Sequence, residues 1–434
     1  MRHKVLILGS LGEFTELVQM AGKKGYETVV CDGYPDGPAR KYADRSYVIP
    51  VTEIDRIATL CREEQVDGII TSFSDLLLEC MVKIADKAGL PCYLKPEQLP
   101  WYRDKSACRL LLEKLGLPSP GYKKISVDFL REKTETELAA TVGELTYPLI
   151  CKPLDKYGSR GIFIIHNPKE IRQKALQTAE YTSCEEILIE EYNDGYEFNM
   201  MTWVTEQKVQ VISIADREKT EMEEGMLPLS TRNVYPSCLL PQVEEEALGI
   251  LQEYIRHTGQ KDGALSMQFF WKPGKGIQVC EIAGRFFGYE HELTEIVYGF
   301  SIEELLLNWL YEKEKISQMF QTHDIHKPLR QGAVIYFQGR NLEIADQSAA
   351  RELAKREGVI KDWIFYQDGE HVVEYGPNPY LALYYTAGNS RKELDALTES
   401  FYREMSIRDP QGREIVYQNK IPEYRSAQES ESKD

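Results

Sequence analysis

The segment from Tyr147 to Gly161 combines an apolar strand, a lysine and a glycine-flanked turn. Residues 149–151 predict a short strand that delivers Lys152, and Gly158, Ser159 and Gly161 form the turn that follows. Backbone N–H groups approach phosphate oxygens closely where no Cβ intervenes, and a lysine ammonium adds a point charge. The segment therefore predicts a polyphosphate site and, with it, a nucleotide-using enzyme.

Further polar residues follow in an order that suits phosphoryl transfer. Two lysines and an arginine can offset the charge that spreads over the β- and γ-phosphates. Mg²⁺ prefers hard oxygen ligands and takes few from protein, which one carboxylate and one amide oxygen on adjacent strands can supply. The candidates, in chain order, are Lys105, Glu190, Glu191, Tyr192, Glu197, Gln268, Glu281 and Arg285.

Four residues are candidates for substrate contacts. Ser74 follows a predicted strand, at the edge where open α/β sheets place their ligands. Tyr289 and His291 follow Arg285 into the region expected to receive the acceptor, and Arg232 ends a loop that could cover the site. An ordinary surface loop is the competing interpretation for these positions.

Elements that alternate between strand and helix fill the first hundred residues. Strands at 5–8, 28–30 and 68–70 are separated by helices, which is typical of a doubly wound parallel sheet. Paired strands follow, with hairpins predicted at 197–214 and 264–282. The fold class is thus α/β and α+β.

Three domains and a tail are expected. They are an α/β domain at 1–98, a two-lobed domain at 99–312 that changes lobe near 186, and a small α+β domain at 325–422. Residues 424–434 are polar and are predicted to be disordered.

Composition excludes several classes of protein. A formal charge of −17 over 434 residues argues against nucleic-acid binding, which calls for a basic surface. No apolar stretch approaches the length of a membrane span. Nine scattered cysteines without a C-x-x-C pair are typical of a reducing compartment, so the expected location is the cytoplasm.

The order of these motifs resembles the ATP-grasp superfamily over roughly residues 1–312, and the third region resembles the small C-terminal domain of its carboxylase and amino-acid-ligase branches. The resemblance implies ATP and Mg²⁺, or Mn²⁺, as cofactors. It also implies a role for each candidate. Phosphates would be held by Lys105, Lys152 and the loop with Gly158, Ser159 and Gly161; adenine by Glu190, Glu191 and Tyr192; ribose by Glu197; metal by Gln268 and Glu281; and the phosphorylated intermediate by Arg285.

Two positions depart from the family pattern. The run from Glu281 to Arg285 has Ala283 in place of the usual asparagine, and Gln268 stands where many members have glutamate. The site carries less negative charge as a result, and the number of Mg²⁺ ions, one or two, stays open. Similar variants occur in active branches of the superfamily, so an active enzyme is still expected.

The resemblance implies an ATP-dependent carboxylate–amine ligase. Such an enzyme forms an acyl phosphate from a small acid or amino acid and then an amide, releasing ADP and phosphate, and its relatives are commonly homodimers. One alternative is a carboxylase-like enzyme that activates bicarbonate as carboxyphosphate. Alternatives of another class are a catalytically silent ligand-binding module and an NAD(P)- or sugar-nucleotide-binding protein, although the turn from Gly9 to Gly12 lacks the third glycine of G-x-G-x-x-G.

Overall fold

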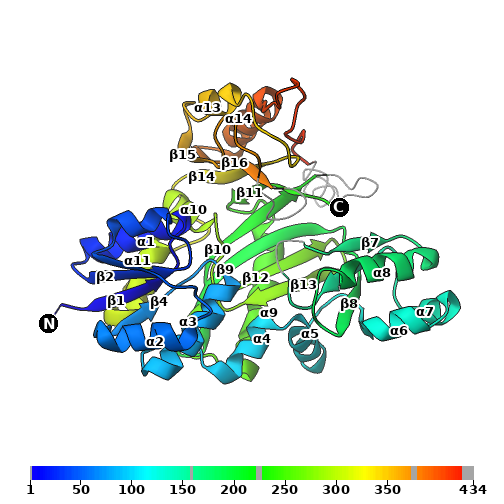
Figure 1. Cartoon of the computed structure of the whole chain (residues 1–434), viewed down its shortest axis with the longest axis horizontal. Coiled ribbons are helices and arrows are strands. Elements are labelled where there is room, and N and C mark those ends of the chain that lie inside the picture. The colour runs from blue at the N-terminus through cyan, green and yellow to red at the C-terminus, as the bar shows by residue number, and fades with distance from the viewer. Residues whose placement is uncertain (1, 157–159, 221–226, 373–378, 423–434) are drawn as a thin grey trace.

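The computed structural model describes residues 2–156, 160–220, 227–372 and 379–422. The predicted loop residues Gly158 and Ser159 and the predicted tail lie outside these ranges. Figure 1 shows an N-terminal unit in blue, a green and yellow body, and a C-terminal unit above it in orange and red. Within the described ranges, no helix has both the length and the apolar character that crossing a bilayer requires.

A parallel four-stranded sheet, in the order β3-β2-β1-β4, forms the N-terminal unit. Its β1 strand is a run of buried Val, Leu and Ile, as expected for a sheet covered on both faces. The predicted doubly wound architecture is thus confirmed. The elements are β1 (Lys4–Leu8), α1 (Thr15–Lys23), β2 (Glu27–Asp32), β3 (Arg45–Val48), α2 (Ile54–Glu63), β4 (Gly68–Ile70) and α3 (Asp75–Ala88).

A second, antiparallel sheet forms a small lobe at the right of Figure 1. Its order is β5-β8-β6-β7, and three helices cover it around a separate apolar core. The lobe changes after Glu191 rather than near residue 186, because β8 is an interior strand of this sheet. The elements are β5 (Tyr122–Ser126), α6 (Val127–Glu132), α7 (Glu135–Thr141), β6 (Leu149–Pro153), β7 (Phe163–Ile165), α8 (Ile171–Ala179) and β8 (Glu186–Glu191).

The largest sheet has eight antiparallel strands in the order β13-β12-β9-β10-β11-β14-β16-β15. Both predicted hairpins are confirmed, since β9 pairs with β10 and β12 pairs with β13. The strands are β9 (Tyr196–Thr205), β10 (Lys208–Lys219), β11 (Ser230–Tyr235), β12 (Gly263–Lys272), β13 (Gly276–Ala283), β14 (Gln331–Gln338), β15 (Val359–Ile364) and β16 (Tyr380–Gly388).

Helices connect the three units. α5 begins after Asp104, whose carboxylate accepts hydrogen bonds from the first backbone amides of the helix, a standard N-cap. α11 packs against α1 and β4, and it thereby joins the N-terminal unit to the body. The remaining helices are α4 (Leu99–Arg103), α5 (Lys105–Lys114), α9 (Leu240–Thr258), α10 (His291–Tyr298), α11 (Ile302–Tyr311), α12 (Glu314–Thr322), α13 (Ser348–Leu353) and α14 (Arg391–Glu404).

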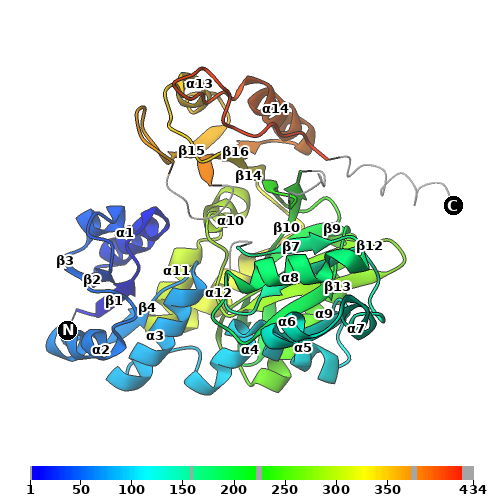
Figure 2. The same ribbon diagram turned by 45° about the vertical axis from the view of Figure 1, so that its right-hand side comes forward.

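The C-terminal unit extends the central sheet rather than standing apart from it. β11 pairs with β14, so the main-chain ladder runs on without a break. Figure 2 shows β14, β15 and β16 above the body. Arg232 of β11 is fully buried at this junction and donates to both carboxylate oxygens of Glu218 at 2.8 Å. It also lies 2.8 Å from Asp395 and 2.9 Å from Thr398, both of α14. Burial and full engagement argue against the substrate contact predicted for Arg232; its position fastens α14 to the sheet instead.

Replacing Arg232 should therefore destabilise the fold. Arg232→Ala leaves Glu218 and Asp395 short of a buried cation, so the free energy of unfolding in urea should fall by about 3–5 kcal/mol. Arg408→Ala is the control, because that side chain is 56% exposed and its ion pair is 3.9 Å long. A loss below about 1 kcal/mol for the Arg232 variant would contradict this role.

Candidate active site

One face of the central sheet carries a continuous row of polar side chains. Glu281 lies directly opposite Gln268, and Gln268 directly opposite Asn199. On the next strand, Asn199 pairs with Ala215. Arg217 lies two residues after Ala215, on the same face, and pairs with Asn233. Cross-strand partners point to the same face, as do residues two apart on one strand. These five polar residues, called the polar row below, therefore share one surface.

Gln268 and Glu281 form the pair of ligand groups that the sequence predicts. The amide nitrogen of Gln268 donates to Glu197, which leaves its amide oxygen as the potential ligand atom. Within the described ranges, no hydrogen bond or ion pair engages the Glu281 carboxylate. One carboxylate and one amide oxygen on adjacent strands fit a Mg²⁺ ion that takes its other ligands from water and phosphate.

A buried carboxylate with two cations lies at the junction of the lobes. Lys152 and Arg109 each approach Glu190 to 2.6 Å, one at each carboxylate oxygen. Burial alone would raise the pKa of Glu190, but the two cations hold it at about 2. Arg109 also donates to the carbonyls of Val279 and Cys280 on β13, at 3.0 and 2.9 Å. Both oxygens of Glu190 are engaged, so this carboxylate is not presented to an adenine ring as predicted.

The backbone after Glu190 is paired within the small lobe. The amide of Glu191 donates to the carbonyl of Gly121, and the amide of Tyr192 to that of Pro148, both at 2.9 Å. The Glu191 carboxylate accepts from the Thr146 amide at 2.8 Å. Glu191 and Tyr192 were predicted to bind adenine, but in this conformation their backbone amides are engaged within the small lobe.

Glu197 is a second buried carboxylate that two cations contact. Arg217 and Lys219, two residues apart on β10, each lie 2.5 Å from its carboxylate. Although burial opposes ionisation, these two cations hold the pKa of Glu197 at about 2. The sequence interpretation missed Arg217 and Lys219, yet their spacing of two on a predicted strand was a usable signal.

Lys105 lies on the same helix as Arg109, one turn before it. Its ammonium donates to the carbonyl of Lys156, at the start of the glycine-flanked loop. Gly161 closes that loop with φ of +70°, and a Cβ there would collide with Tyr181. Helix α5 thus connects to both predicted lysines: Lys105 contacts the loop, and Lys152 shares Glu190 with Arg109 of the same helix.

Arg285 faces the N-terminal unit. Its guanidinium makes a bidentate contact with Asp75 at the start of α3, at 3.0 and 2.9 Å. The next amide, that of Phe286, donates to Ser72 at 3.2 Å. Ser74, a predicted substrate contact, is half-buried at the N-cap position of α3, beside this pair. The carboxyl edge of the parallel sheet therefore orients the arginine of the site.

His291 was predicted to contact substrate, but it is 1% exposed. It lies 2.6 Å from Glu303 of α11 and 3.3 Å from Glu292, and its ring stacks on Phe73 at 4.0 Å. These contacts tie α10 to α11 and make His291 a structural residue. Tyr289, in contrast, is half-buried with φ of +58°, a left-handed conformation that costs energy and is enriched at functional sites.

His291 should make stability depend on alkaline pH. Burial lowers the pKa of His291, but Glu292 and Glu303 outweigh it and raise the pKa from 6.5 to about 9. The extra stability is complete below the unfolded pKa and is lost as pH rises through 9. This shift corresponds to roughly 3 kcal/mol.

Urea unfolding of the wild type and of His291→Asn at about pH 6 and about pH 10 measures this contribution. The stability difference between the two proteins should shrink by about 3 kcal/mol at the higher pH. A difference that stays constant with pH would show that His291 is not charged in the fold.

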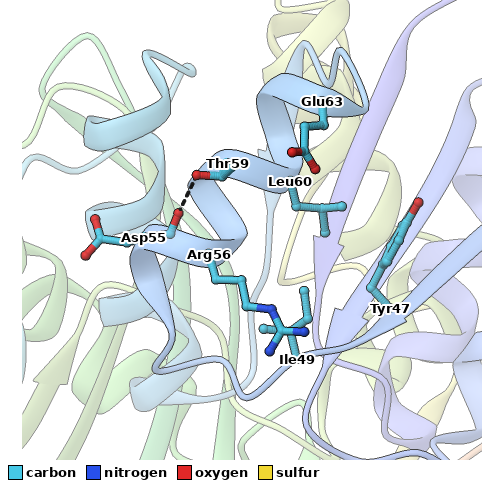
Figure 3. Close-up of a pocket in the computed structure, with 7 residues that line it drawn as sticks. All are labelled: Tyr47, Ile49, Asp55, Arg56, Thr59, Leu60 and Glu63. Atoms are coloured by element: carbon cyan, nitrogen blue, oxygen red, sulfur yellow. Dashed lines mark hydrogen bonds between the residues drawn. The ribbon is translucent and has the colours of Figure 1, made fainter.

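A surface hollow of the protein lies away from the candidate active site. It measures about 550 Å³ and lies between β3 and α2 of the N-terminal unit (Figure 3). None of the predicted site residues lines it, and it opens widely to solvent. Its lining is Tyr47, Ile49, Asp55, Arg56, Thr59, Leu60 and Glu63.

Two parts of the chain match models of known protein domains. Residues 145–292 match the model of the ATP-grasp domain, and residues 5–90 match the N-terminal domain of PylC-like proteins. Over 211 residues the chain is 29% identical to the arginine-specific carbamoyl phosphate synthase large chain of Geobacillus stearothermophilus, covering 45% of this chain and 19% of that protein. A formate-dependent phosphoribosylglycinamide formyltransferase of Stenotrophomonas maltophilia is 26% identical over 204 residues, covering 46% and 50%. The chain thus spans a fifth to a half of these curated relatives.

Solved structures share the whole architecture. The L-amino acid ligase from Bacillus licheniformis superposes with a TM-score of 0.76 over 94% of this chain and 99% of that one, at 19% identity. The biotin carboxylase domain of a Hydrogenobacter thermophilus 2-oxoglutarate carboxylase, solved with MgADP, ADP and bicarbonate, gives 0.72 over 96% and 92%, at 15% identity.

These matches show that the chain carries an ATP-grasp domain at residues 145–292, and they confirm the resemblance to the ATP-grasp superfamily seen in its motifs. This domain follows a segment, residues 5–90, that matches the N-terminal domain of PylC-like proteins.

Proposed function

We propose that this protein is an ATP-dependent carboxylate–amine ligase that acts on small molecules. The observation that supports the proposal most is the arrangement around Gln268 and Glu281. Arg109 links β13, the strand of Glu281, to Glu190 and Lys152, and Arg285 follows two residues after β13 ends. Cations thus lie on β6, on α5 and just beyond β13, and together with the two candidate metal ligands they would supply the charge that phosphoryl transfer from ATP requires.

The reaction has two steps. A carboxylate oxygen of the acid attacks the γ-phosphorus of ATP, and the bond to the bridging oxygen breaks, with its electron pair leaving on ADP. The nitrogen of the amine then attacks the acyl carbon, and phosphate leaves with the electrons of the carbon–oxygen bond. The amine loses its proton, so the products are an amide, ADP and phosphate.

This chain's residues bind and neutralise charge in both steps. Lys105 and Lys152 are placed to hold phosphate oxygens, and Arg109 stays to neutralise Glu190 when Lys152 turns toward a nucleotide. Arg285, held by Asp75, is placed to stabilise the transferred phosphoryl group. Gln268 and Glu281 would hold Mg²⁺, which neutralises charge on the β- and γ-phosphates.

The proposal is tested by incubating the protein with ATP, Mg²⁺ and a panel of amino acids and small carboxylic acids, with amines or hydroxylamine as acceptors. ADP release that depends on an acid–amine pair, with an amide or hydroxamate as product, supports ligation. ADP release with bicarbonate alone would favour the carboxylase alternative. A change in nicotinamide absorbance without ATP turnover would favour the NAD(P)-binding alternative. Nucleotide binding without turnover would favour the catalytically silent module.

Lys152→Ala should reduce turnover about 10²–10³-fold, because one preorganised charged donor contributes about 2.7–4 kcal/mol to the transition state. The fold should survive, since Arg109 still pairs with the buried Glu190. Lys123→Ala, a lysine of the same lobe that pairs with the exposed Glu144, is the matched control and should keep full turnover. Unchanged ADP release by a folded Lys152 variant would count against the proposed phosphate site.

Glu281→Gln should raise the Mg²⁺ concentration needed for half-maximal turnover by at least tenfold, on the order seen when a metal site loses a supporting group. The variant replaces the charged member of the pair with a second amide, and Mg²⁺ binds a neutral oxygen more weakly. Glu253→Gln on the exposed side of α9 serves as the control. An identical Mg²⁺ dependence in both variants would remove Glu281 from the metal site.

A further inference from the structure

Glu290 extends the site beyond its predicted residues. Its carboxyl group lies over the polar row and is only 4% exposed. The side-chain amide of Asn199 donates to one carboxylate oxygen at 2.7 Å, and the hydroxyl of Tyr235 donates to the other at 2.5 Å. Both donors are neutral, so the carboxylate is oriented without being neutralised.

The contrast with the other buried carboxylates of the site is sharp. Glu190 and Glu197 each contact two cations at 2.5–2.6 Å. Within the described ranges, no ion pair engages Glu290. The charges of Arg217 and Arg285 favour its ionised form from a longer range, but burial outweighs them and raises its pKa to about 7. A buried carboxylate without a cation in direct contact is costly, and a bound positive group would offset that cost.

A second buried acceptor lies beside it. The amide nitrogen of Asn199 is taken by Glu290, while its amide oxygen has no hydrogen-bond partner among the described residues. Asn199 is only 3% exposed. The unpaired oxygen and the carboxylate are thus close together, and a group that carries several N–H donors and a positive charge would satisfy both.

The location of this pair fixes which part of a substrate could reach it. Asn199 is the direct cross-strand neighbour of Gln268, and adjacent strands are about 4.8 Å apart. A carboxylate undergoing phosphorylation must lie next to Gln268 and Glu281. A positive group two bonds from that carboxylate therefore falls within reach of Glu290.

We propose that Glu290, oriented by Tyr235 and joined by Asn199, binds the α-ammonium group of the carboxyl substrate, which is an α-amino acid. This inference rests on the proposed ligase function and narrows it. It assigns the amino acid as the acid that is phosphorylated, rather than only as the amine that attacks.

The test compares amino acids with their des-amino analogues, using hydroxylamine to trap the acyl phosphate as a hydroxamate. The pairs are phenylalanine with 3-phenylpropanoate, leucine with 4-methylpentanoate, and alanine with propanoate. The wild type should prefer at least one amino acid over its analogue by about 100-fold or more in kcat/KM, the scale for a site built to pair a polar group. In Glu290→Gln that ratio should fall below about 10, mainly through a higher KM for the amino acid.

Glu295→Gln is the matched control, because Glu295 is an exposed carboxylate on the neighbouring helix α10 and should keep the wild-type ratio. Tyr235→Phe, which removes only the hydroxyl that orients Glu290, should also lower the ratio and provides a second variant if Glu290→Gln does not fold.

The outcomes separate the two proposals. Hydroxamate formed equally well from both members of each pair would overturn the ammonium site and leave the ligase proposal intact. An unchanged ratio in a folded Glu290 or Tyr235 variant would do the same. No hydroxamate from any acid, in a protein that still binds ATP, would overturn the ligase proposal, and the ammonium site with it.

Discussion

The Arg109 guanidinium is the interaction on which the geometry of the site depends. It binds Glu190 of the small lobe and, at the same time, two carbonyl groups of β13 in the central sheet. Lys152 is held by the other oxygen of the same carboxylate. Because one planar group reaches both lobes, Lys152, the proposed phosphate-binding residue, and the proposed metal-ligand pair keep a fixed relation while these contacts hold.

The buried carboxylates of the site are balanced by cations in direct contact, not by an overall excess of positive charge in the protein. The protein is strongly acidic overall, yet its central carboxylates Glu190 and Glu197 are each held by two cations. Such buried clusters are costly to break and keep long side chains in one conformation. Glu290 is the exception among them, since its donors are uncharged. This difference is the basis of our proposal that a substrate, rather than the protein, supplies the positive charge at Glu290.

Local sequence patterns predicted the elements well but not the long-range pairing between them. Both hairpins and the parallel sheet follow from periodicity, and the opposed positions of Gln268 and Glu281 follow from the hairpin that joins them. Arg109, Asp75 and Arg232 acquire their partners across 81, 210 and 166 positions of chain, and no local pattern reports such contacts. The burial of His291 was missed for the same reason, because its partner Glu303 lies on the next helix.

The ladder between β11 and β14 has a consequence for movement. Four consecutive residue pairs, from Arg232 with Ile335 to Tyr235 with Gly332, join the C-terminal unit to the central sheet through the main chain. A rigid-body rotation of the C-terminal unit would break these main-chain hydrogen bonds. We therefore expect the unit to stay fixed relative to the central sheet. The small lobe has its own core and its own sheet, so it could move without breaking this ladder, although the contacts of Arg109 to β13 would then have to be released.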